Sequence, residues 1–185
     1  MAPTIPKHAK VVFKGIRFDV YHWRQRLRNG SYTTFEGVRR HYGVRVLPVI
    51  GNKIFVAKER LIDGRTIIGT FGGLVEKNES PLSAAKRELL EESGLKSKRW
   101  KLIQVEEPIR PEGVIDWKAY LFIARDCKKV ARQKLDISED IEIKAVTLEQ
   151  LLQISSTWGE FDLKVLREAR QSARGRDKLR KFLFG

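Results

Sequence analysis

Residues 73–95 read GLVEKNESPLSAAKRELLEESGL, and this stretch indicates both a fold and a chemistry. It places Glu88, Glu91 and Glu92 on one face of a predicted helix, beside apolar neighbours. Carboxylates three and four residues apart on a helix repel one another, at a cost of about 0.2–0.5 kcal/mol per pair. A bound divalent cation would offset that repulsion, so the stretch predicts a metal site.

The bounds of this helix follow from the residues at its two ends. Ser80 is a favourable side-chain cap, and Pro81 is tolerated in the first helical turn. Gly94 suits the left-handed residue that ends many helices, so the helix is expected over residues 81–93. One side of it, which includes Leu89, can pack while the other presents oxygens. Oxygen ligands of this kind suit Mg²⁺ or Mn²⁺, and not zinc.

The spacing within the stretch is G-x5-E-x7-R-E-U-x-E-E-x-G-U, where U is aliphatic, and all nine specified positions are filled. This pattern resembles the Nudix box, the signature of hydrolases that cleave a diphosphate linked to another moiety. The resemblance implies that a metal-activated water attacks one phosphorus, with no covalent enzyme intermediate. An acidic run on a helix is more often a solvated face, but the complete box outweighs that interpretation.

The resemblance also implies a role for each polar residue of the box. Arg87 is expected to pair with one of the carboxylates and to orient it. Glu79 is the outer glutamate, either a more distant metal ligand or a structural residue. The expected cation is Mg²⁺, with Mn²⁺ as the alternative. Its expected ligands are the carbonyl of Gly72 and the side chains of Glu88, Glu91 and Glu92.

The composition of the 185-residue chain is that of a globular protein with one core, or one core and an appendage. Hydrophobic residues make up 42% and charged residues 32%, without the run of about 18 apolar residues that predicts a membrane span. The first ten residues lack an apolar secretory segment. The single cysteine, Cys127, fits a reducing compartment, so we expect a cytoplasmic protein without membrane contact.

The net charge of +14 is the least expected feature of the composition. It would suit attraction of small polyphosphates or contact with nucleic acid. The two basic groups of the chain lack the interleaved aromatic side chains that stack on bases, so a solvated basic surface is the default interpretation and nucleic acid the less favoured partner. One group lies within residues 164–181, and the other consists of Lys128, Lys129, Arg132 and Lys134.

Alternating apolar residues and turn signals divide the rest of the chain. A strand or hairpin arm is expected over residues 10–21, a turn over residues 28–31 and a second arm over residues 32–40. Further strands are expected over residues 44–50, from residue 54, and over residues 66–70, 100–105, 114–124 and 139–146. Helices are expected over residues 147–154 and 160–182.

This order of elements predicts an α+β fold. The resemblance implies a Nudix-type α/β/α sandwich with a mixed sheet, an N-terminal β-arm and a C-terminal helix. The expected division is an arm over residues 1–41, the Nudix domain over residues 42–158, and a basic helix packed on that domain over residues 159–185.

Features outside the box resemble the ADP-ribose pyrophosphatase branch of the family. The arm ends at residues 34–40, and members of that branch often use such an arm across a homodimer. Pro111 lies sixteen residues after Leu95, where the branch commonly has a proline. The residues Phe71-Gly72-Gly73 depart from the Pro-Ala-Gly that tends to enter the box in this branch, so the substrate is not fixed by the resemblance.

An acidic stretch over residues 138–142 is the third such feature. In the branch that it resembles, a loop before the final strand can carry the catalytic base. Glu139 matches that position best, with Asp136 and Glu142 as alternatives.

Substrate contacts are expected from the arm and from the turns near the box. Arg40 or Arg39 would reach the phosphates if the arm crosses a dimer, and Arg60 precedes a turn that opens toward the box. Trp117 is a candidate for stacking on a base, although an aromatic residue in an alternating strand is more often part of a core. Pro111 completes the expected substrate-binding set.

The sequence therefore predicts a Mg²⁺-dependent Nudix diphosphate hydrolase. Its expected substrate is a nucleoside diphosphate derivative, above all ADP-ribose or a similar nucleotide sugar, which yields a nucleoside monophosphate and a sugar phosphate. Two alternatives stay open. One is a nucleotide- or RNA-binding Nudix module with little turnover, and the other is a hydrolase that acts on RNA ends or dinucleoside polyphosphates.

Overall fold

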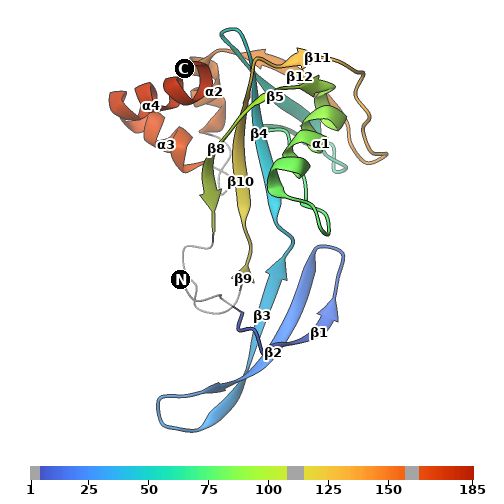
Figure 1. Cartoon of the computed structure of the whole chain (residues 1–185), viewed down its shortest axis with the longest axis vertical. Coiled ribbons are helices and arrows are strands. Elements are labelled where there is room, and N and C mark those ends of the chain that lie inside the picture. The colour runs from blue at the N-terminus through green and yellow to red at the C-terminus, as the bar shows by residue number, and fades with distance from the viewer. Residues whose placement is uncertain (1–4, 108–114, 157–162) are drawn as a thin grey trace. The chain divides into compact units, whose positions relative to one another are not determined.

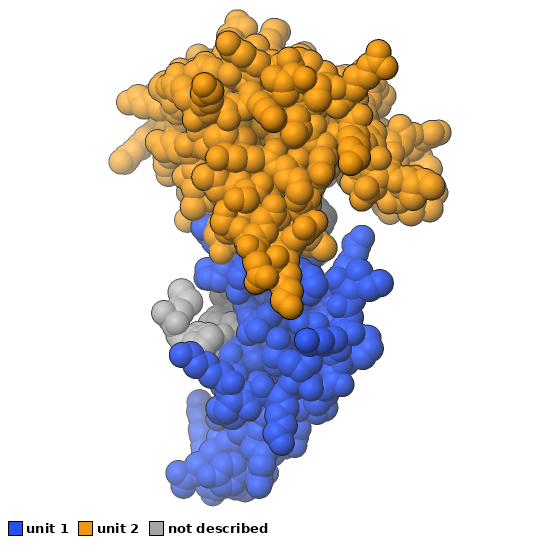
Figure 2. Space-filling model, turned by 45° about the vertical axis from the view of Figure 1, so that its right-hand side comes forward, with its two compact units in different colours: residues 1–43, 105–119 blue, residues 44–104, 120–185 orange. Residues whose placement is uncertain are grey.

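The computed structural model describes residues 5–107, 115–156 and 163–185 (Figure 1). The chain forms two compact units, shown in different colours in Figure 2. The smaller unit contains residues 1–43 and 105–119, and the larger contains residues 44–104 and 120–185. No local pattern in the sequence indicated that residues 105–119 group with the N-terminal strands. The three-part division at residues 41/42 and 158/159 stays a prediction.

The larger unit is built on a six-stranded sheet with the strand order β12-β5-β4-β10-β8, in which β6 also pairs with β5. Strand β5 is antiparallel to β4, β6 and β12. The strands are β4 (Gly43–Ile50), β5 (Lys53–Arg60), β6 (Thr66–Gly69), β8 (Arg99–Glu106), β10 (Ala119–Arg125) and β12 (Ile141–Val146).

Helices cover both faces of this sheet, as Figure 1 shows. One face carries α2 (Leu148–Ser155), α3 (Lys164–Gln171) and α4 (Ala173–Phe184). The other face carries α1 (Pro81–Ser93). The expected α+β fold and α/β/α sandwich are therefore confirmed. None of the helices in the described ranges is long and apolar enough to cross a membrane.

The alternation of side chains along β10 shows why both faces can be covered. Leu121 and Ile123 are buried against the three helices, whereas Phe122 and Ala124 are buried on the side of α1. A strand with helices on both faces needs a continuous apolar run, because successive side chains point to opposite faces.

The smaller unit is a four-stranded sheet in the order β1-β2-β3-β9. Strands β2 and β3 form an antiparallel hairpin across the predicted turn, and β9 runs parallel to β3. The second arm is confirmed, but the expected first arm is divided between two strands. The amide of Gly15 donates to the carbonyl of Phe18 at 2.9 Å, which turns the chain between them. The strands are β1 (Lys10–Lys14), β2 (Phe18–Arg26), β3 (Tyr32–Arg40) and β9 (Ile115–Asp116).

Two other expected elements are wrong as single elements. The strand over residues 114–124 is two strands, β9 and β10, in different sheets. The expected helix over residues 160–182 is α3 and α4, separated by Ser172 in an extended conformation (φ −150°, ψ 148°). The Ser172 hydroxyl accepts from the amide of Gly175 at 3.0 Å, so this serine caps a new helix. The last strand also begins later than expected, at Ile141.

A two-stranded sheet lies outside these larger sheets. It pairs β7 (Leu95–Lys96), which directly follows α1, with β11 (Lys128–Lys129). The second basic group of the sequence therefore begins beside the end of the box helix.

Candidate active site

Helix α1 begins and ends where the sequence predicts. The hydroxyl of Ser80 accepts from the amide of Ser83 at 3.1 Å, and Pro81 occupies the first turn. Gly94 adopts a left-handed conformation (φ 64°), and its amide donates to the carbonyl of Leu90 at 2.7 Å. These two caps fix where the glutamates of the box lie along the helix.

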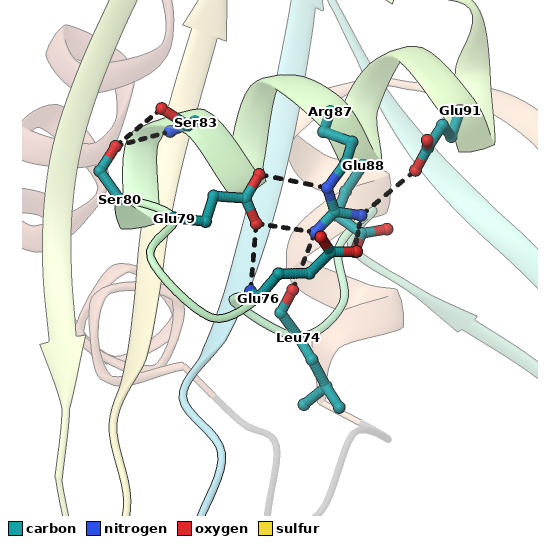
Figure 3. Close-up of polar contacts among 8 residues, drawn as sticks. All are labelled: Leu74, Glu76, Glu79, Ser80, Ser83, Arg87, Glu88 and Glu91. Atoms are coloured by element: carbon teal, nitrogen blue, oxygen red, sulfur yellow. Dashed lines mark hydrogen bonds and ion pairs between the residues drawn. The ribbon is translucent and has the colours of Figure 1, made fainter.

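Arg87 holds three of the carboxylates that precede and line the helix (Figure 3). Its Nε and Nη2 atoms donate to the two oxygens of Glu79, at 3.2 and 3.0 Å. Its Nη1 atom donates to Glu88 at 2.8 Å and to Glu91 at 3.2 Å. Nη2 also donates to the carbonyl of Leu74 at 3.0 Å. A guanidinium group has five N–H donors, so these contacts use its full capacity.

The contacts of Glu79 bear on the two roles left open for it. Both of its oxygens face Arg87, and one also accepts from the amide of Glu76 at 3.1 Å. The hydrogen bond from Arg87 holds the pKa of Glu79 below its ordinary value. This arrangement favours the structural role, in which Glu79 fixes the guanidinium group that in turn orients Glu88 and Glu91.

Glu92, one turn after Glu88, is buried, with only 6% of its surface exposed. Burial raises the pKa of Glu92 to about 8, against the effect of the Gly72 amide, which donates to its Oε2 atom at 2.7 Å. The nearby charges of Glu88, Glu139 and Glu59 raise the pKa further. Burial also raises the pKa of Glu88, although Arg87 opposes the shift.

Two glycines let the backbone approach these carboxylates. A Cβ atom on Gly73 would stand 2.7 Å from the carboxyl carbon of Glu88, so a side chain there would require the Glu88 carboxylate to move. Gly72 has a φ of +142°, and a Cβ atom there would stand 2.8 Å from the carbonyl carbon of Val44. The position therefore requires glycine for both its conformation and its surroundings.

The carbonyl of Gly72 is placed differently from those of its neighbours. The carbonyls of Phe71 and Gly73 accept from the amides of Val46 and Val44, at 2.7 and 2.9 Å. Within the described ranges the Gly72 carbonyl has no such backbone partner. It is therefore available as an oxygen ligand, as the resemblance implies.

The donor set fits a hard divalent cation. Glu88 accepts hydrogen bonds through Oε1 and Glu92 through Oε2, and within the described part of the chain no protein donor reaches the other oxygen of either group. As the side chains stand, no three His, Cys, Asp or Glu residues among those described converge closely enough to hold a metal. Mg²⁺ prefers oxygen ligands such as carboxylates and backbone carbonyls. A bound cation would also offset the repulsion between the carboxylates.

The acidic loop brings Glu139 toward the box. Its charge contributes to the raised pKa values of both Glu88 and Glu92. The amide of Asp136 donates to Glu139 Oε2 at 2.9 Å, which holds the side chain within the loop. The alternative Glu142 instead pairs with Lys58 at 3.1 Å and with Lys144, so the structure favours Glu139 over Glu142 as the carboxylate near the box.

Sequence reasoning missed one acidic residue of this cluster, Glu59 on β5. Burial, and then the charge of Glu139, raises the pKa of Glu59 above its ordinary value. Phe55 and Ala57 pack on the side of the sheet that faces α1, and Glu59 follows them at the same two-residue spacing. An acidic residue that continues an apolar strand face is a signal that could have identified it.

The expected substrate-binding residues do not come together on one element. Arg60 pairs with Asp140 at 2.6 Å, directly beside Glu139 in sequence. Arg40 is exposed at the end of β3, and Trp117 is half-buried between β9 and β10, both in the smaller unit. Arg39 contacts Asp116 at 2.7 Å, so it is engaged within that unit. Pro111 lies outside the described residues.

A hollow of about 440 Å³ lies elsewhere in the larger unit and contains none of the box glutamates. It is formed where β8 begins, β10 ends and α4 ends. Its lining residues are Lys98, Arg99, Trp100, Lys101, Arg125, Lys181 and Gly185. The carboxylate cluster, and not this hollow, carries the chemistry expected of the box.

Comparisons with known proteins agree with the fold and the box. A family model described as the NUDIX domain matches residues 39–169. A relative from Bacillus subtilis (strain 168), described as ADP-ribose pyrophosphatase, is 32% identical over 156 residues, which are 83% of this chain and 83% of that protein. A crystal structure described as an ADP compounds hydrolase superposes with a TM-score of 0.68, over 98% of this chain and 95% of that one. At 20% identity the latter shows a shared fold.

Proposed function

The chain belongs to the Nudix family and is a hydrolase of diphosphate bonds, and from that premise we propose that it cleaves ADP-ribose or a similar nucleotide sugar in a Mg²⁺-dependent reaction. The observation that carries the proposal is that Glu88 and Glu92 lie close enough for their charges to interact, and that each has one carboxylate oxygen that no described protein donor reaches. Glu92 also accepts from the amide of Gly72, whose carbonyl has no backbone partner among the described residues. The relative described as ADP-ribose pyrophosphatase supports the choice of substrate.

We propose that the carbonyl of Gly72 and the carboxylates of Glu88, Glu91 and Glu92 hold the cation. When bound, Mg²⁺ would neutralise charge on the diphosphate oxygens and make a coordinated water more acidic. Arg87 would keep Glu88 and Glu91 in place through hydrogen bonds of 2.8 and 3.2 Å. Manganese, which has similar ligand preferences, is the alternative cation.

Glu139 is the proposed acceptor of the water proton. Its charge acts on the box glutamates, whereas its alternative Glu142 is paired with two lysines. A carboxylate in this position can take the proton as the water attacks one phosphorus. Arg60, which is fixed by Asp140 next to Glu139, is the proposed phosphate contact in the larger unit. Arg40, Pro111 and Trp117 are proposed contacts from the part of the chain around the smaller unit.

A substrate panel tests the proposed reaction. ADP-ribose, a second nucleotide sugar, a dinucleoside polyphosphate and 5′-triphosphate RNA are incubated separately with the full chain and Mg²⁺, and the products are separated by chromatography. We expect the fastest release from ADP-ribose, as a nucleoside monophosphate and a sugar phosphate. Release from the dinucleoside polyphosphate or RNA alone would reject the proposed substrate but retain the family chemistry.

Homodimer formation is a further proposal, supported by apolar side chains that the smaller unit exposes. Phe13 is 60% exposed and Ile16 is 91% exposed, and every residue of edge strand β1 is exposed. Exposed apolar edge strands are favoured sites of association. We expect Ile16→Ser to shift sedimentation toward the monomer. The matched control is Ile62→Ser, because Ile62 is 92% exposed but lies in the larger unit.

An anion-binding role is the second candidate function, favoured by the hollow beside β8. Trp100 lines this hollow and lies between Arg99 and Lys101 in sequence. An aromatic residue interleaved with cations in this way is absent from the two basic groups. Part of the charge is already used, because Arg99 pairs with Asp126 at 2.6 Å and Arg125 donates to the last carbonyls of α4. RNA affinity that falls steeply with salt and is lost in Lys98→Glu, with no hydrolysis of any panel substrate, would favour this role.

We also propose a cytoplasmic location. The supporting observation is that Cys127, the single cysteine, is a buried thiol. Fractionation of producing cells, with detection of the full chain in each fraction, checks this proposal.

A further inference from the structure

The C-terminal end of α1 is held by a segment that is distant in sequence. The last four carbonyls of a helix have no partner within it, and each needs a donor from elsewhere. Here the carbonyls of Glu91, Glu92, Ser93 and Gly94 all accept from residues 129–134, which follow β10 in the chain. The box helix is therefore capped twice, by its own Gly94 and by this segment.

The donors in the segment are distributed over these four carbonyls. The amide of Lys134 donates to Glu91 at 2.8 Å, and the Lys129 ammonium donates to Ser93 at 2.7 Å. The amides of Val130 and Ala131 donate to Gly94 at 2.9 and 3.3 Å. A cation at a helix C-terminus is also favoured by the helix dipole. This assigns a structural purpose to part of the second basic group that the composition left unexplained.

Gln133 differs from the other donors because it joins two elements. Its Nε2 atom donates to the carbonyl of Glu92 at 2.7 Å and to the carbonyl of Ile141 at 3.0 Å. Glu92 is a proposed metal ligand, and Ile141 is the first residue of β12, two residues after Glu139. Ile141 is also the register partner of Glu59 on β5. One amide group thus joins the last turn of the box helix to the strand that ends the acidic loop.

We propose that Gln133 is a positioning residue, which fixes the distance between the end of α1 and the loop that carries Glu139. The inference rests on the proposed function, in which Glu92 binds the cation and Glu139 accepts the water proton. Without the bridge, Lys129, Val130, Ala131 and Lys134 would still hold the segment to the end of α1. The end of α1 would, however, lose its described hydrogen-bonded link to Ile141 at the start of β12. Outer contacts that orient metal ligands commonly affect activity by about 10–100-fold when they are removed.

The test compares Gln133→Met with two matched variants. Methionine has a similar length but no donor, so it breaks both hydrogen bonds of Gln133. Lys129→Met removes a donor that caps only α1, and Gln153→Met changes an exposed glutamine of α2. With ADP-ribose and saturating Mg²⁺, we expect Gln133→Met to lower kcat by about 10–100-fold with KM little changed. Gln153→Met should match the wild type, and Lys129→Met should lower thermal stability more than kcat.

A second measurement does not depend on turnover. The Gly72 amide donates to the carboxylate of Glu92, so its NMR shift and hydrogen exchange report the position of that side chain in the metal-free protein. We expect Gln133→Met, but not Lys129→Met, to shift this resonance and to speed its exchange. Gln133→Lys, which restores a donor of similar reach, should recover most of both signals and of kcat.

The outcomes separate this proposal from the proposed function. An unchanged Gly72 resonance and unchanged kcat in folded Gln133→Met would overturn the positioning role. Equal losses of kcat in Gln133→Met and Lys129→Met would also overturn it, because capping alone would then account for both. If no panel substrate is cleaved, the proposed function fails, and the Gly72 resonance still decides whether Gln133 positions Glu92. If Gln133→Met does not fold, the test uses Gln133→Lys instead. A folded Gln133→Lys in which the Gly72 amide resonance does not return to its wild-type position would overturn the positioning role.

Discussion

The two ends of helix α1 are held in place by different kinds of contact. At the N-terminal end Ser80 caps the helix, and from its middle Arg87 gathers Glu79, Glu88 and Glu91, all within a short stretch of chain. At the C-terminal end, the carbonyls accept from residues 129–134, and Glu92 accepts from the amide of Gly72. The first set of contacts joins residues that are close in sequence, whereas the second joins residues that only the fold brings together.

This difference shows how a local motif acquires its chemistry. The box supplies carboxylates at fixed spacing, but the buried position of Glu92 and the approach of Glu139 come from strands outside it. A carboxylate that is buried among other carboxylates is costly unless a cation or a proton is bound. Changes at either end should therefore affect turnover for different reasons, and four predictions test this, from the largest effect to the smallest.

The largest effect on turnover is expected from Glu139→Gln. This change removes the proposed proton acceptor, which lies in the acidic loop outside the box. Loss of a general base typically lowers turnover by about 10²–10⁴-fold. The matched change is Glu142→Gln in the same acidic stretch, whose side chain pairs with Lys58 and Lys144 instead. Steady-state kinetics with ADP-ribose should show a loss of kcat in the first variant alone. Equal activity in both variants would remove Glu139 from the mechanism.

A smaller loss is expected from Gly73→Ala at the start of the box. The added methyl group would stand 2.7 Å from the carboxyl carbon of Glu88 and must displace that side chain. A misplacement of a catalytic group by about 1 Å can lower turnover by about 10²-fold. The control is Gly69→Ala, where a Cβ atom would meet nothing within 4 Å. If both variants turn over at the wild-type rate, Glu88 does not need its observed position.

Arg87→Lys should lower turnover less than the two preceding changes. Lysine keeps the charge but cannot contact Glu79, Glu88 and Glu91 together in the planar geometry of the guanidinium group. We expect kcat to fall by about 10–100-fold. We also expect the free energy of unfolding to fall by about 1–3 kcal/mol, because partly buried carboxylates lose their donors. Urea unfolding and kinetics on the same preparation measure both, and Lys86→Arg, on the same helix, is the control.

The fourth prediction concerns the stability of the metal-free protein against pH, and not turnover. Burial raises the pKa of Glu92 to about 8, from an ordinary value of 4.5. Between these values the unfolded chain has lost a proton that the folded chain keeps, so the free energy of unfolding should fall as pH rises. The decline should end above about pH 8, where both states are ionised.

Glu92→Gln should reduce this pH dependence, because glutamine does not titrate. Urea unfolding in the presence of a chelator, at several pH values, compares the two proteins. Glu88 and Glu59, whose pKa values are also raised by burial, should leave a residual slope of the same sign. Parallel curves for the wild type and the variant would mean that Glu92 ionises freely in the folded chain.

The same contrast between local and remote contacts explains what could be predicted from sequence. The bounds of α1 were predictable because Ser80, Pro81 and Gly94 act within a few residues of it. The role of Gln133 was not, because its two acceptors lie on elements that only the fold brings together. Strand β9 is a similar case, since its place beside β3 depends on a parallel pairing between residues distant in sequence.

Two other features differed from the sequence-based expectation although the sequence contained a local signal for each. In both cases a more general pattern favoured the other interpretation. The break at Ser172 interrupts an amphipathic pattern that continues through α3 and α4, so periodicity alone joined the two helices. A serine three residues before Gly175 is a recognisable helix cap, and its hydroxyl does accept from that amide. Glu59 was overlooked because a charged residue at the end of a strand usually faces solvent, whereas here it faces the box.

If the box glutamates act through a divalent cation, turnover must depend on added Mg²⁺, and a Mg²⁺ titration of turnover measures that dependence. ADP-ribose cleavage is followed for the wild type and Glu92→Gln, from chelator-treated protein to saturating Mg²⁺. We expect no turnover without metal, a saturable rise in the wild type, and a loss of at least about 10³-fold in a folded Glu92→Gln. Turnover that is equal in the two proteins, or that does not depend on added Mg²⁺ or Mn²⁺, would contradict it.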